Sequence, residues 1–239
     1  MQEIIRNLCK QLRLGSQIAE TYSQVEAASQ EDFLIKVLTE AVEAREVERK
    51  NRYIQQAGFE IIKRFETFDF SSVTLPGGVT PEILKSCEFV KNKQNLILYG
   101  RPGTGKSHLA SALGVEACRL GYKTIYYKTS RLVNLLSEAR KAGTEAKFWK
   151  RLGQADVLIL DEWGYIPFER VGTQLLFEAI SDCYEKRSVI ITTNLPFDEW
   201  NTIFYDQKLT TAILDRLVHH GLLLMHEGQS YRLQHAKMQ

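Results

Sequence analysis

An α/β fold, with a parallel five-stranded sheet and a small helical domain before it, is the architecture that this sequence predicts. Three observations lead to it. Short apolar segments alternate with helical stretches from residue 95 onward, a glycine-rich turn joins the first of these segments to the next helix, and residues 1–65 show helical periodicity without a proline. Alternating strands and helices indicate a parallel sheet that binds its ligand at the carboxyl ends of the strands.

Residues 1–65 are expected to form the helical domain and residues 66–239 the domain that contains the sheet. Apolar residues within 32–56 recur at the spacing of one helical stripe, and Gly58 suits the end of that helix. A shorter amphipathic helix is expected near residues 2–13. A piece of this size with few aromatic residues has a thin core, so we expect it to pack on the rest of the chain or on a partner.

The second domain begins with a turn and continues with the strands. A Thr-Leu-Pro-Gly-Gly sequence at 74–78 predicts the turn, and Pro81 suits the start of a helix. The first and third expected strands are almost wholly apolar, as central parallel strands covered on both faces are. The five expected strands are 95–99, 123–127, 157–160, 188–192 and 222–225, and a helix is expected at 171–185.

Composition excludes several classes of protein. The 239 residues are 44% hydrophobic and 25% charged, which is typical of a globular chain and not of a disordered one. No uncharged apolar run approaches the ~18 residues that a membrane-spanning helix needs, and the N-terminus lacks the apolar core of a signal peptide. The four cysteines lie far apart without a Cys-x-x-Cys pair, which argues against a disulfide framework or a zinc knuckle and favours the cytoplasm.

Positive charge is concentrated in one part of the chain. The protein carries 31 Lys and Arg against 29 Asp and Glu, a net charge of +2, but residues 119–151 contain 9 of the former and 2 of the latter, a net +7. Such a block indicates a polyanionic partner. A solvated, lysine-rich helical face explains the same charge equally well, so charge alone leaves both interpretations open.

The glycine-rich turn has the composition of a phosphate-binding loop. Residues 100–107 read Gly-Arg-Pro-Gly-Thr-Gly-Lys-Ser and fit G-x-x-x-x-G-K-[ST] at every fixed position, between a strand and a helix. The glycines let backbone N–H groups point at phosphate oxygens, and the helix presents its positive end. Lys106 is expected to reach the β- and γ-phosphates of ATP and Ser107 to hold Mg²⁺. The expected nucleotide-binding residues are Gly100, Pro102, Gly103, Thr104, Gly105, Lys106, Ser107 and His108.

Polar residues follow two other strands at the same expected edge of the sheet. We expect Asp161 to hold Mg²⁺ through water and Glu162 to polarise the attacking water, although an acid that only starts the next helix is the alternative for both. Asn194 can orient the water or contact the γ-phosphate, whereas an Asn before Leu-Pro is often just a turn former. Together with the loop, these residues predict Mg²⁺-dependent hydrolysis of ATP.

Beyond these motifs, the sequence resembles the IstB-like transposition helper proteins of bacterial insertion sequences, AAA+ ATPases related to the DnaC helicase loader and the DnaA initiator. The matching segments span about residues 30–233 and are AREVERKNRYIQQAGF, FETFDF, LILDEWGYIPF, TTNLPFDEWNTIF, AILDRLVHHG and GQSYRL. TTNLPFDEW combined with DRLVHH and SYRL is far more specific than the general ATPase motifs. Glu162 is a departure, since many relatives have Asp there, and either acid can orient water.

The resemblance implies roles for further residues and an AAA+ core without a full C-terminal lid, for which the chain leaves no room after its last strand. Asn194 would be the sensor of the γ-phosphate. Arg216 would be the arginine finger that completes the site of a neighbouring subunit, with a surface pair to Asp215 as the alternative. For Arg232, a role as a second sensor and the absence of such a role are equally compatible with the sequence.

Aromatic and histidine residues near these motifs receive less definite interpretations. Phe68 and Phe70 are expected to pack either near the adenine or in the core. His219 and His220 have no ligand partner at metal spacing in the sequence, so they are interpreted as structural or surface residues.

The resemblance also gives the basic block a meaning. In this clade the segment between the second and third strands forms a helical insert that lines a DNA-facing surface. Nothing in the chain resembles a base-reading module, so contacts independent of DNA sequence are expected. The implied DNA-binding residues are Lys128, Arg131, Arg140, Lys141, Lys147, Lys150 and Arg151.

The implied function is that of a DNA-dependent ATPase that assembles on double-stranded DNA and assists a transposase in selecting its target. The expected partners are double-stranded DNA, the cognate transposase and further copies of the chain in an oligomer that depends on ATP and DNA, with no membrane. A DnaC-like helicase loader is the alternative, and the partner of the N-terminal segment would distinguish the two. An ATPase-dead scaffold is disfavoured because Lys106, Asp161 and Glu162 are intact.

Overall fold

The computed structural model describes the chain except for residues 16, 205 and 235–239, and except for the side chains of Arg232 and Gln234. Its contacts group the chain into two compact units, residues 1–52 and 53–239. The first unit is helical, as predicted, and holds α1, α2, η1 and most of α3. Their bounds are α1 (Gln2–Gln11), α2 (Ile18–Thr21), η1 (Tyr22–Gln24) and α3 (Gln30–Gln56).

The core of the first unit is as thin as its composition predicts. Its buried hydrophobic cluster consists of Cys9, Ile18, Val37 and Ala41. Other apolar residues of α1 and α3 remain exposed, among them Leu8 and Val42.

Five parallel strands form the sheet of the second unit, as predicted, and a sixth strand joins its edge. The strands are β1 (Val73–Thr74), β2 (Asn95–Gly100), β3 (Thr124–Lys128), β4 (Val157–Trp163), β5 (Ser188–Thr193) and β6 (Gly221–His226), in the order β1-β6-β2-β5-β4-β3. Strand β1 runs antiparallel to β6 through only two residue pairs. The prediction of a turn alone at 74–78 was therefore incomplete, because two residues are too few to show strand periodicity.

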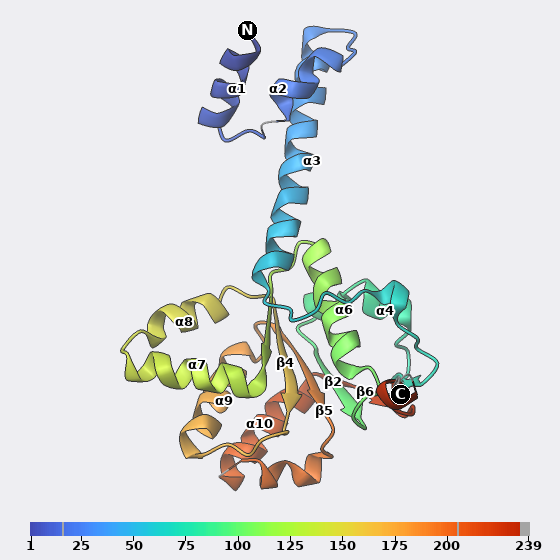
Figure 1. Ribbon diagram of the computed structural model, residues 1–239, viewed down its shortest axis with the longest axis vertical. Coiled ribbons are helices and arrows are strands. Elements are labelled where there is room, and N and C mark those ends of the chain that lie inside the picture. The colour runs from blue at the N-terminus through green and yellow to red at the C-terminus, as the bar shows by residue number, and fades with distance from the viewer. Residues whose placement is uncertain (16, 205, 235–239) are drawn as a thin grey trace, which may run out of the picture. The chain divides into compact units, whose positions relative to one another are not determined.

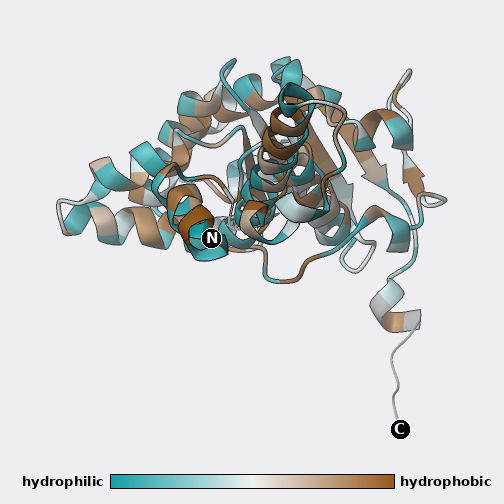
Figure 2. Ribbon diagram, turned by 90° about the horizontal axis from the view of Figure 1, so that it is seen from above, coloured by the Kyte–Doolittle hydropathy of each residue, from teal (hydrophilic) through white to brown (hydrophobic). Residues whose placement is uncertain are grey.

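Helices cover both faces of the sheet (Figure 1). One face carries α4 (Pro81–Lys85), α5 (Glu88–Lys91) and α6 (Lys106–Arg119), and the other carries α7 (Thr129–Lys141), α9 (Arg170–Cys183) and α10 (Gln207–His219). Side chains of β2 alternate between the two cores, with Leu96 and Leu98 on the α6 side and Ile97 on the other. The strands accordingly show hydrophobic colours in Figure 2, whereas most helices show both colours.

The remaining short elements complete the second unit. They are η2 (Phe65–Thr67), α8 (Glu145–Leu152), η3 (Phe197–Thr202) and α11 (Tyr231–Gln234). Helices α7 and α8 form the predicted helical insert between β3 and β4. No helix within the described part of the chain combines the length and the apolar character needed to cross a membrane.

The segment after α3 is joined to the sheet and not to the helical unit. The backbone N–H of Tyr126 donates to the carbonyl of Ala57 at 2.7 Å, and the Ser111 hydroxyl donates to the carbonyl of Ile61 at 2.8 Å. Gly58 follows the end of α3 with a φ of +85°, and a side chain there would lie 3.2 Å from the carbonyl oxygen of Tyr126. These contacts explain why the compact unit begins at Tyr53, whereas the sequence places the boundary near residue 66.

Candidate nucleotide-binding site

The turn between β2 and α6 forms a tight loop at the carboxyl end of β2. A side chain at Gly100 would lie 2.2 Å from the carbonyl oxygen of His226, and one at Gly105, which has a φ of +88°, would lie 3.0 Å from the Phe68 ring. Only glycine fits both positions. The loop and the first turn of α6 contain all eight residues predicted to bind nucleotide, namely Gly100, Pro102, Gly103, Thr104, Gly105, Lys106, Ser107 and His108.

The ammonium group of Lys106 lies inside this loop. The side chain is only 5% exposed, and its Nζ donates to the carbonyls of Gly100 at 2.7 Å and Arg101 at 2.8 Å. A buried charge needs such acceptors. A phosphate oxygen would be a stronger partner, because a charge-assisted hydrogen bond exceeds one to a neutral carbonyl.

Asp161 is the buried centre of the site. Its carboxylate is 2% exposed and accepts hydrogen bonds from three hydroxyl groups. Ser107 Oγ at the start of α6 donates at 2.8 Å, Thr192 Oγ1 donates from β5, and the Tyr126 hydroxyl donates from β3. Burial, together with the adjacent Asp161 carboxylate, raises the pKa of Tyr126 far above its ordinary value, so this phenol remains a hydrogen-bond donor.

Sequence analysis missed Tyr126 and Thr192, and also Thr129, whose hydroxyl donates to the backbone carbonyl of Asp161 at 2.9 Å. The available signal was that hydroxyl residues lie near the carboxyl ends of the strands on either side of β4. The order of strands in the sheet was needed to use it, because only that order places β3 and β5 beside β4.

Glu162 has a backbone conformation that is uncommon for a residue with a side chain. Its φ is +58°, and the pairing of β4 with β5 shifts register between Leu160 and Trp163. Left-handed geometry at such a residue costs about 1–3 kcal/mol and often marks a functional position. The backbone N–H of Glu162 donates to Thr192 Oγ1 at 3.0 Å. The irregularity explains how two consecutive strand residues, which would ordinarily face opposite sides, both come to the same edge of the sheet.

The side chain of Glu162 is paired with Lys128. Lys128 Nζ lies 3.3 Å from Glu162 Oε1 and 3.4 Å from Glu60 Oε2. The interaction with Glu162 is the main reason why the pKa of Lys128 is raised. Lys128 is thus engaged beside Asp161, its register partner across β3 and β4, and not on the free basic face where the sequence placed it.

Asn194 follows β5 directly. Its carboxamide oxygen is buried and has no hydrogen-bond partner among the described residues. The turn after β5 is made instead by Thr193, whose hydroxyl donates to the Trp163 carbonyl at 3.0 Å and accepts from the Leu195 N–H at 3.1 Å. The Asn194 side-chain oxygen is therefore not used to form the turn.

Aromatic residues line the other side of the loop. The Phe68 ring lies 5.2 Å from the His108 ring and 4.8 Å from the Phe70 ring. His108 Nε2 lies 3.3 Å from Thr67 Oγ1, and burial lowers the pKa of this histidine. Phe68 and Phe70 also pack on the core beneath α6, so the two interpretations of these rings are compatible.

Arg216 is remote from the loop of its own chain. Asn95 at the amino end of β2 donates to the Arg216 carbonyl at 3.3 Å, whereas the loop leaves the carboxyl end of that strand. Six strand residues span about 20 Å. The guanidinium group lies over the Phe177 ring at 5.0 Å and the Tyr184 ring at 5.9 Å, and no ion pair joins it to Asp215 in the described structure.

The basic residues of the helical insert fall into two groups. Arg140 is held by Glu145 at 2.8 Å and Glu178 at 2.7 Å, so it links α7, α8 and α9 and is not a free cation. The five other predicted residues that lie in the insert are exposed and form no ion pair with any described residue. They are Arg131, Lys141, Lys147, Lys150 and Arg151. Phe148 and Trp149 pack on the core.

The start of α11 touches the loop. The N–H of Tyr231 donates to the Gly103 carbonyl at 3.0 Å. The suggestion that Arg232 is a second sensor concerns a side chain outside the described residues.

Comparison with known proteins agrees with this geometry. The family described as "IstB-like ATP binding protein" matches residues 8–239. The chain belongs to this family. The IstB-like chain is 38% identical over 205 residues to "Insertion sequence IS21 putative ATP-binding protein" of Pseudomonas aeruginosa, covering 84% of this chain and 76% of that one. It is 35% identical over 249 residues to "Insertion sequence IS5376 putative ATP-binding protein" of Geobacillus stearothermophilus, covering 100% and 97%.

The fold of this IstB-like protein also occurs in a solved structure. The crystal structure of the DnaC helicase loader is similar, with a TM-score of 0.50 and 23% identity, over 73% of this chain and 98% of that one. At this identity the likeness concerns the fold alone. The IstB-like chain is therefore an ATP-binding protein with an α/β fold like that of the DnaC helicase loader, which confirms the predicted fold class, family and nucleotide.

Proposed function

We propose that this IstB-like protein hydrolyses ATP with Mg²⁺ and, as an oligomer on double-stranded DNA, assists the transposase of an insertion sequence. The observation that carries the catalytic part is the pairing of Ser107 with Asp161 at the phosphate loop, with Glu162 beside them. The names of the relatives, which are ATP-binding proteins of insertion sequences, support the biological part.

The residues at the loop suit a magnesium ion. Ser107 Oγ and Asp161 Oδ1 lie 2.8 Å apart, and hydroxyl and carboxylate oxygens are the ligands that Mg²⁺ prefers. Ser107 and Asp161 would hold the ion, the latter through water. When bound, the ion neutralises negative charge on the β- and γ-phosphate oxygens.

The other side chains divide the remaining tasks. Lys106 and the loop N–H groups bind the phosphates. Glu162 polarises the attacking water, and Lys128 holds the Glu162 side chain at this edge of the sheet through their 3.3 Å ion pair. Asn194 orients the same water or the γ-phosphate, using a carboxamide whose oxygen is free of other partners among the described residues.

A neighbouring copy of the chain in the oligomer supplies a second cation to the site, the guanidinium of Arg216. Arg216 lies at the opposite end of β2 from its own loop, so its guanidinium would act on a neighbouring copy. In other nucleotide hydrolases an arginine supplied in this way raises the rate by ~10³–10⁵.

The exposed cations of α7 and α8 provide the DNA contact. Arg131, Lys141, Lys147, Lys150 and Arg151 have no competing carboxylate among the described residues, so phosphate groups can neutralise them. Contacts of this kind position a protein on DNA without reading its sequence.

The deciding experiment measures ATP turnover with and without Mg²⁺ and double-stranded DNA, followed by strand transfer by the cognate transposase. We expect turnover that requires Mg²⁺, rises with DNA and stimulates strand transfer. Lys106→Ala should abolish ATP turnover and the stimulation of strand transfer. Lys85→Ala, which removes an exposed lysine of α4, should leave both unchanged. Turnover that DNA does not affect, combined with tight binding to a replicative helicase, would favour a helicase loader.

A further inference from the structure

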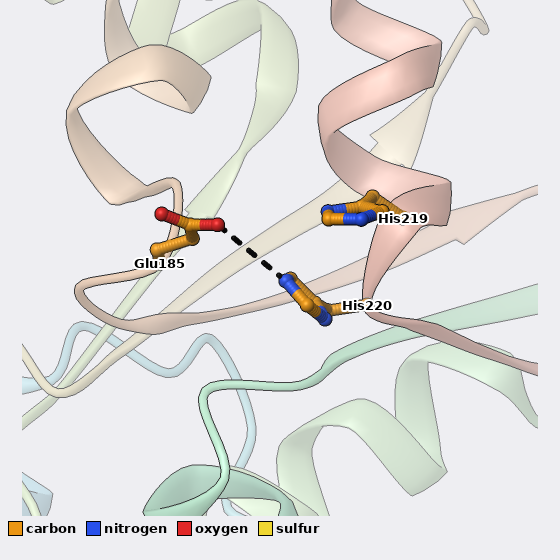
Figure 3. Close-up of side chains that lie close together, drawn as sticks. All are labelled: Glu185, His219 and His220. Atoms are coloured by element: carbon orange, nitrogen blue, oxygen red, sulfur yellow. Dashed lines mark ion pairs between the residues drawn. The ribbon is translucent and has the colours of Figure 1, made fainter.

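A cluster of two histidines and one glutamate lies at the amino edge of the sheet, away from the phosphate loop. His219 and His220 end α10, and Glu185 lies in the turn between α9 and β5 (Figure 3). One nitrogen of each imidazole and one carboxylate oxygen all lie within 4.8 Å of one another. Glu185 is the partner that the sequence did not reveal, since it precedes the histidines by more than 30 positions. The two histidines are surface residues, as interpreted, and the fold adds a carboxylate beside them that sequence spacing does not show.

A buried asparagine holds the backbones of the two turns in register. Asn95 is 6% exposed, and its Nδ2 donates to the Leu217 carbonyl at 3.1 Å while its Oδ1 accepts from the Val189 N–H at 2.9 Å. Its own N–H donates to the His220 carbonyl at 2.8 Å. Because one residue bonds to both chain segments, the ligand-bearing turns are fixed relative to each other before any ion binds. Preorganised ligands of this kind bind with a smaller entropic cost.

The side chains need only small rotations to coordinate an ion. Ligand atoms around a tetrahedral Zn²⁺ ion with bonds of about 2.0–2.1 Å are about 3.3 Å apart. His220 Nε2 already lies 3.7 Å from Glu185 Oε1, and the two imidazole centroids are 4.1 Å apart. All three residues are exposed, so water has access to the site.

Tyr184 supplies the outer contact that metal-binding histidines usually have. Its hydroxyl lies 2.8 Å from Nδ1 of His219. In metal sites, a ligating imidazole donates the N–H of its other nitrogen to such a partner, which fixes the ring. Nδ1–H of His219 would therefore donate to the Tyr184 oxygen and leave Nε2 for the ion.

We propose that Glu185, His219 and His220 form a surface site for a divalent transition-metal ion of the zinc type. Two imidazoles and one carboxylate favour Zn²⁺, Ni²⁺ or Co²⁺ over Mg²⁺, which prefers oxygen ligands. Water completes the coordination shell. The ion clamps the α9–β5 turn to the end of α10, the helix that carries Arg216.

The test is a calorimetric titration of the full chain, without an affinity tag, with Zn²⁺ in buffer free of nucleotide. We expect one ion per chain, and a binding constant that falls by about tenfold or more in Glu185→Gln and in the double variant His219→Gln/His220→Gln. Lys106→Ala should bind Zn²⁺ as the unaltered protein does, because the phosphate loop is a separate site.

A second measurement separates loss of the site from loss of the fold. Without metal, Glu185→Gln should unfold at the temperature of the unaltered protein, because exposed substitutions change the unfolding free energy by only about 0.5 kcal/mol. Added Zn²⁺ should raise the unfolding temperature of the unaltered chain and not that of the variant. Absence of binding by the unaltered chain at ~100 μM Zn²⁺, or undiminished affinity when Glu185→Gln is combined with His219→Gln/His220→Gln, would overturn the proposal.

Discussion

The carboxyl edge of the sheet and the surface of α7 and α8 differ in how their charged groups are held. At the sheet edge, Asp161 is buried, and three hydroxyl groups from three elements orient its carboxylate. On the helices, Lys141 and Lys150 are exposed and pair with no described acid. Chemistry at a γ-phosphate needs fixed geometry, whereas attraction of a polyanion needs only charge of one sign. A single substitution at the sheet edge should therefore lower ATP turnover strongly. Substitutions on the helices should each weaken DNA binding a little, and their effects should add.

The largest effect is expected from Arg216→Ala. If the sheet edge is completed only by a neighbour, this substitution should lower ATP turnover by ~10³-fold or more while ATP binding is retained. Mixing it with Lys106→Ala subunits, each inactive alone, should restore activity, because mixed interfaces pair an intact loop with an intact arginine. Steady-state ATPase assays at several mixing ratios provide the measurement. A rate per subunit that changes neither with mixing nor with concentration would place Arg216 outside the reaction.

Glu162→Gln should have the next largest effect. The amide cannot polarise water as the carboxylate does, so turnover should fall by ~10²-fold or more with ATP affinity unchanged. Equilibrium binding of a fluorescent ATP analogue and single-turnover hydrolysis separate the two quantities. Glu145→Gln is a matched control, since Glu145 is also paired with a basic residue but lies on α8. Full hydrolysis by Glu162→Gln would remove this residue from the mechanism.

The helical surface should respond in proportion to the charge that is removed. Changing Lys141, Lys147, Lys150 and Arg151 together to alanine should weaken binding to double-stranded DNA. The slope of log affinity against log salt should fall by about 3–4, because each phosphate contact contributes about 0.9.

A control with the same net charge distinguishes a DNA surface from a general effect of charge. It replaces four exposed basic residues outside the helical insert, namely Lys85, Lys91, Arg170 and Lys208. An equal change of slope in both variants would mean that α7 and α8 are only a solvated face.

The smallest effect concerns the hydroxyl groups that orient Asp161. Tyr126→Phe removes one donor to a buried carboxylate, so the free energy of unfolding should fall by about 1.5–3 kcal/mol at neutral pH. Urea denaturation measures it. Tyr99→Phe on β2 serves as the control, because the Tyr99 hydroxyl forms no hydrogen bond with the described residues, and its stability should hardly change. Equal stability of both variants would show that the Tyr126 contact contributes nothing to the rigidity of the edge.

The sequence predicted local chemistry better than spatial pairing. The loop at 100–107 and the acids near the end of β4 follow from residue type and periodicity along the chain, and the helical insert follows from the family resemblance. The bond from Tyr126 to Asp161 depends on β3 lying beside β4, and no spacing rule encodes this neighbourhood. Lys128 was assigned to the DNA-binding surface for the same reason, because its ion pair with Glu162 also depends on β3 lying beside β4.

Two further features escaped prediction for different physical reasons. Strand β1 is only two residues long, so hydrophobic alternation could not reveal it. The encounter of Glu185 with the histidines arises where two loops meet at one edge of the sheet, and it depends on tertiary packing alone.

Strand β2 has a mechanical consequence. Its carboxyl end leads into the phosphate loop, and its first residue, Asn95, is bonded to the carbonyls of Arg216 and Leu217. The phosphate loop therefore lies at the carboxyl end of β2, and the helix that carries Arg216 is bonded to its amino end. A displacement of β2 along its axis would move both the phosphate loop and the end of α10. Within an assembled ring or filament, β2 would couple the presence of nucleotide at one subunit's loop to the position of Arg216 at the next subunit's site.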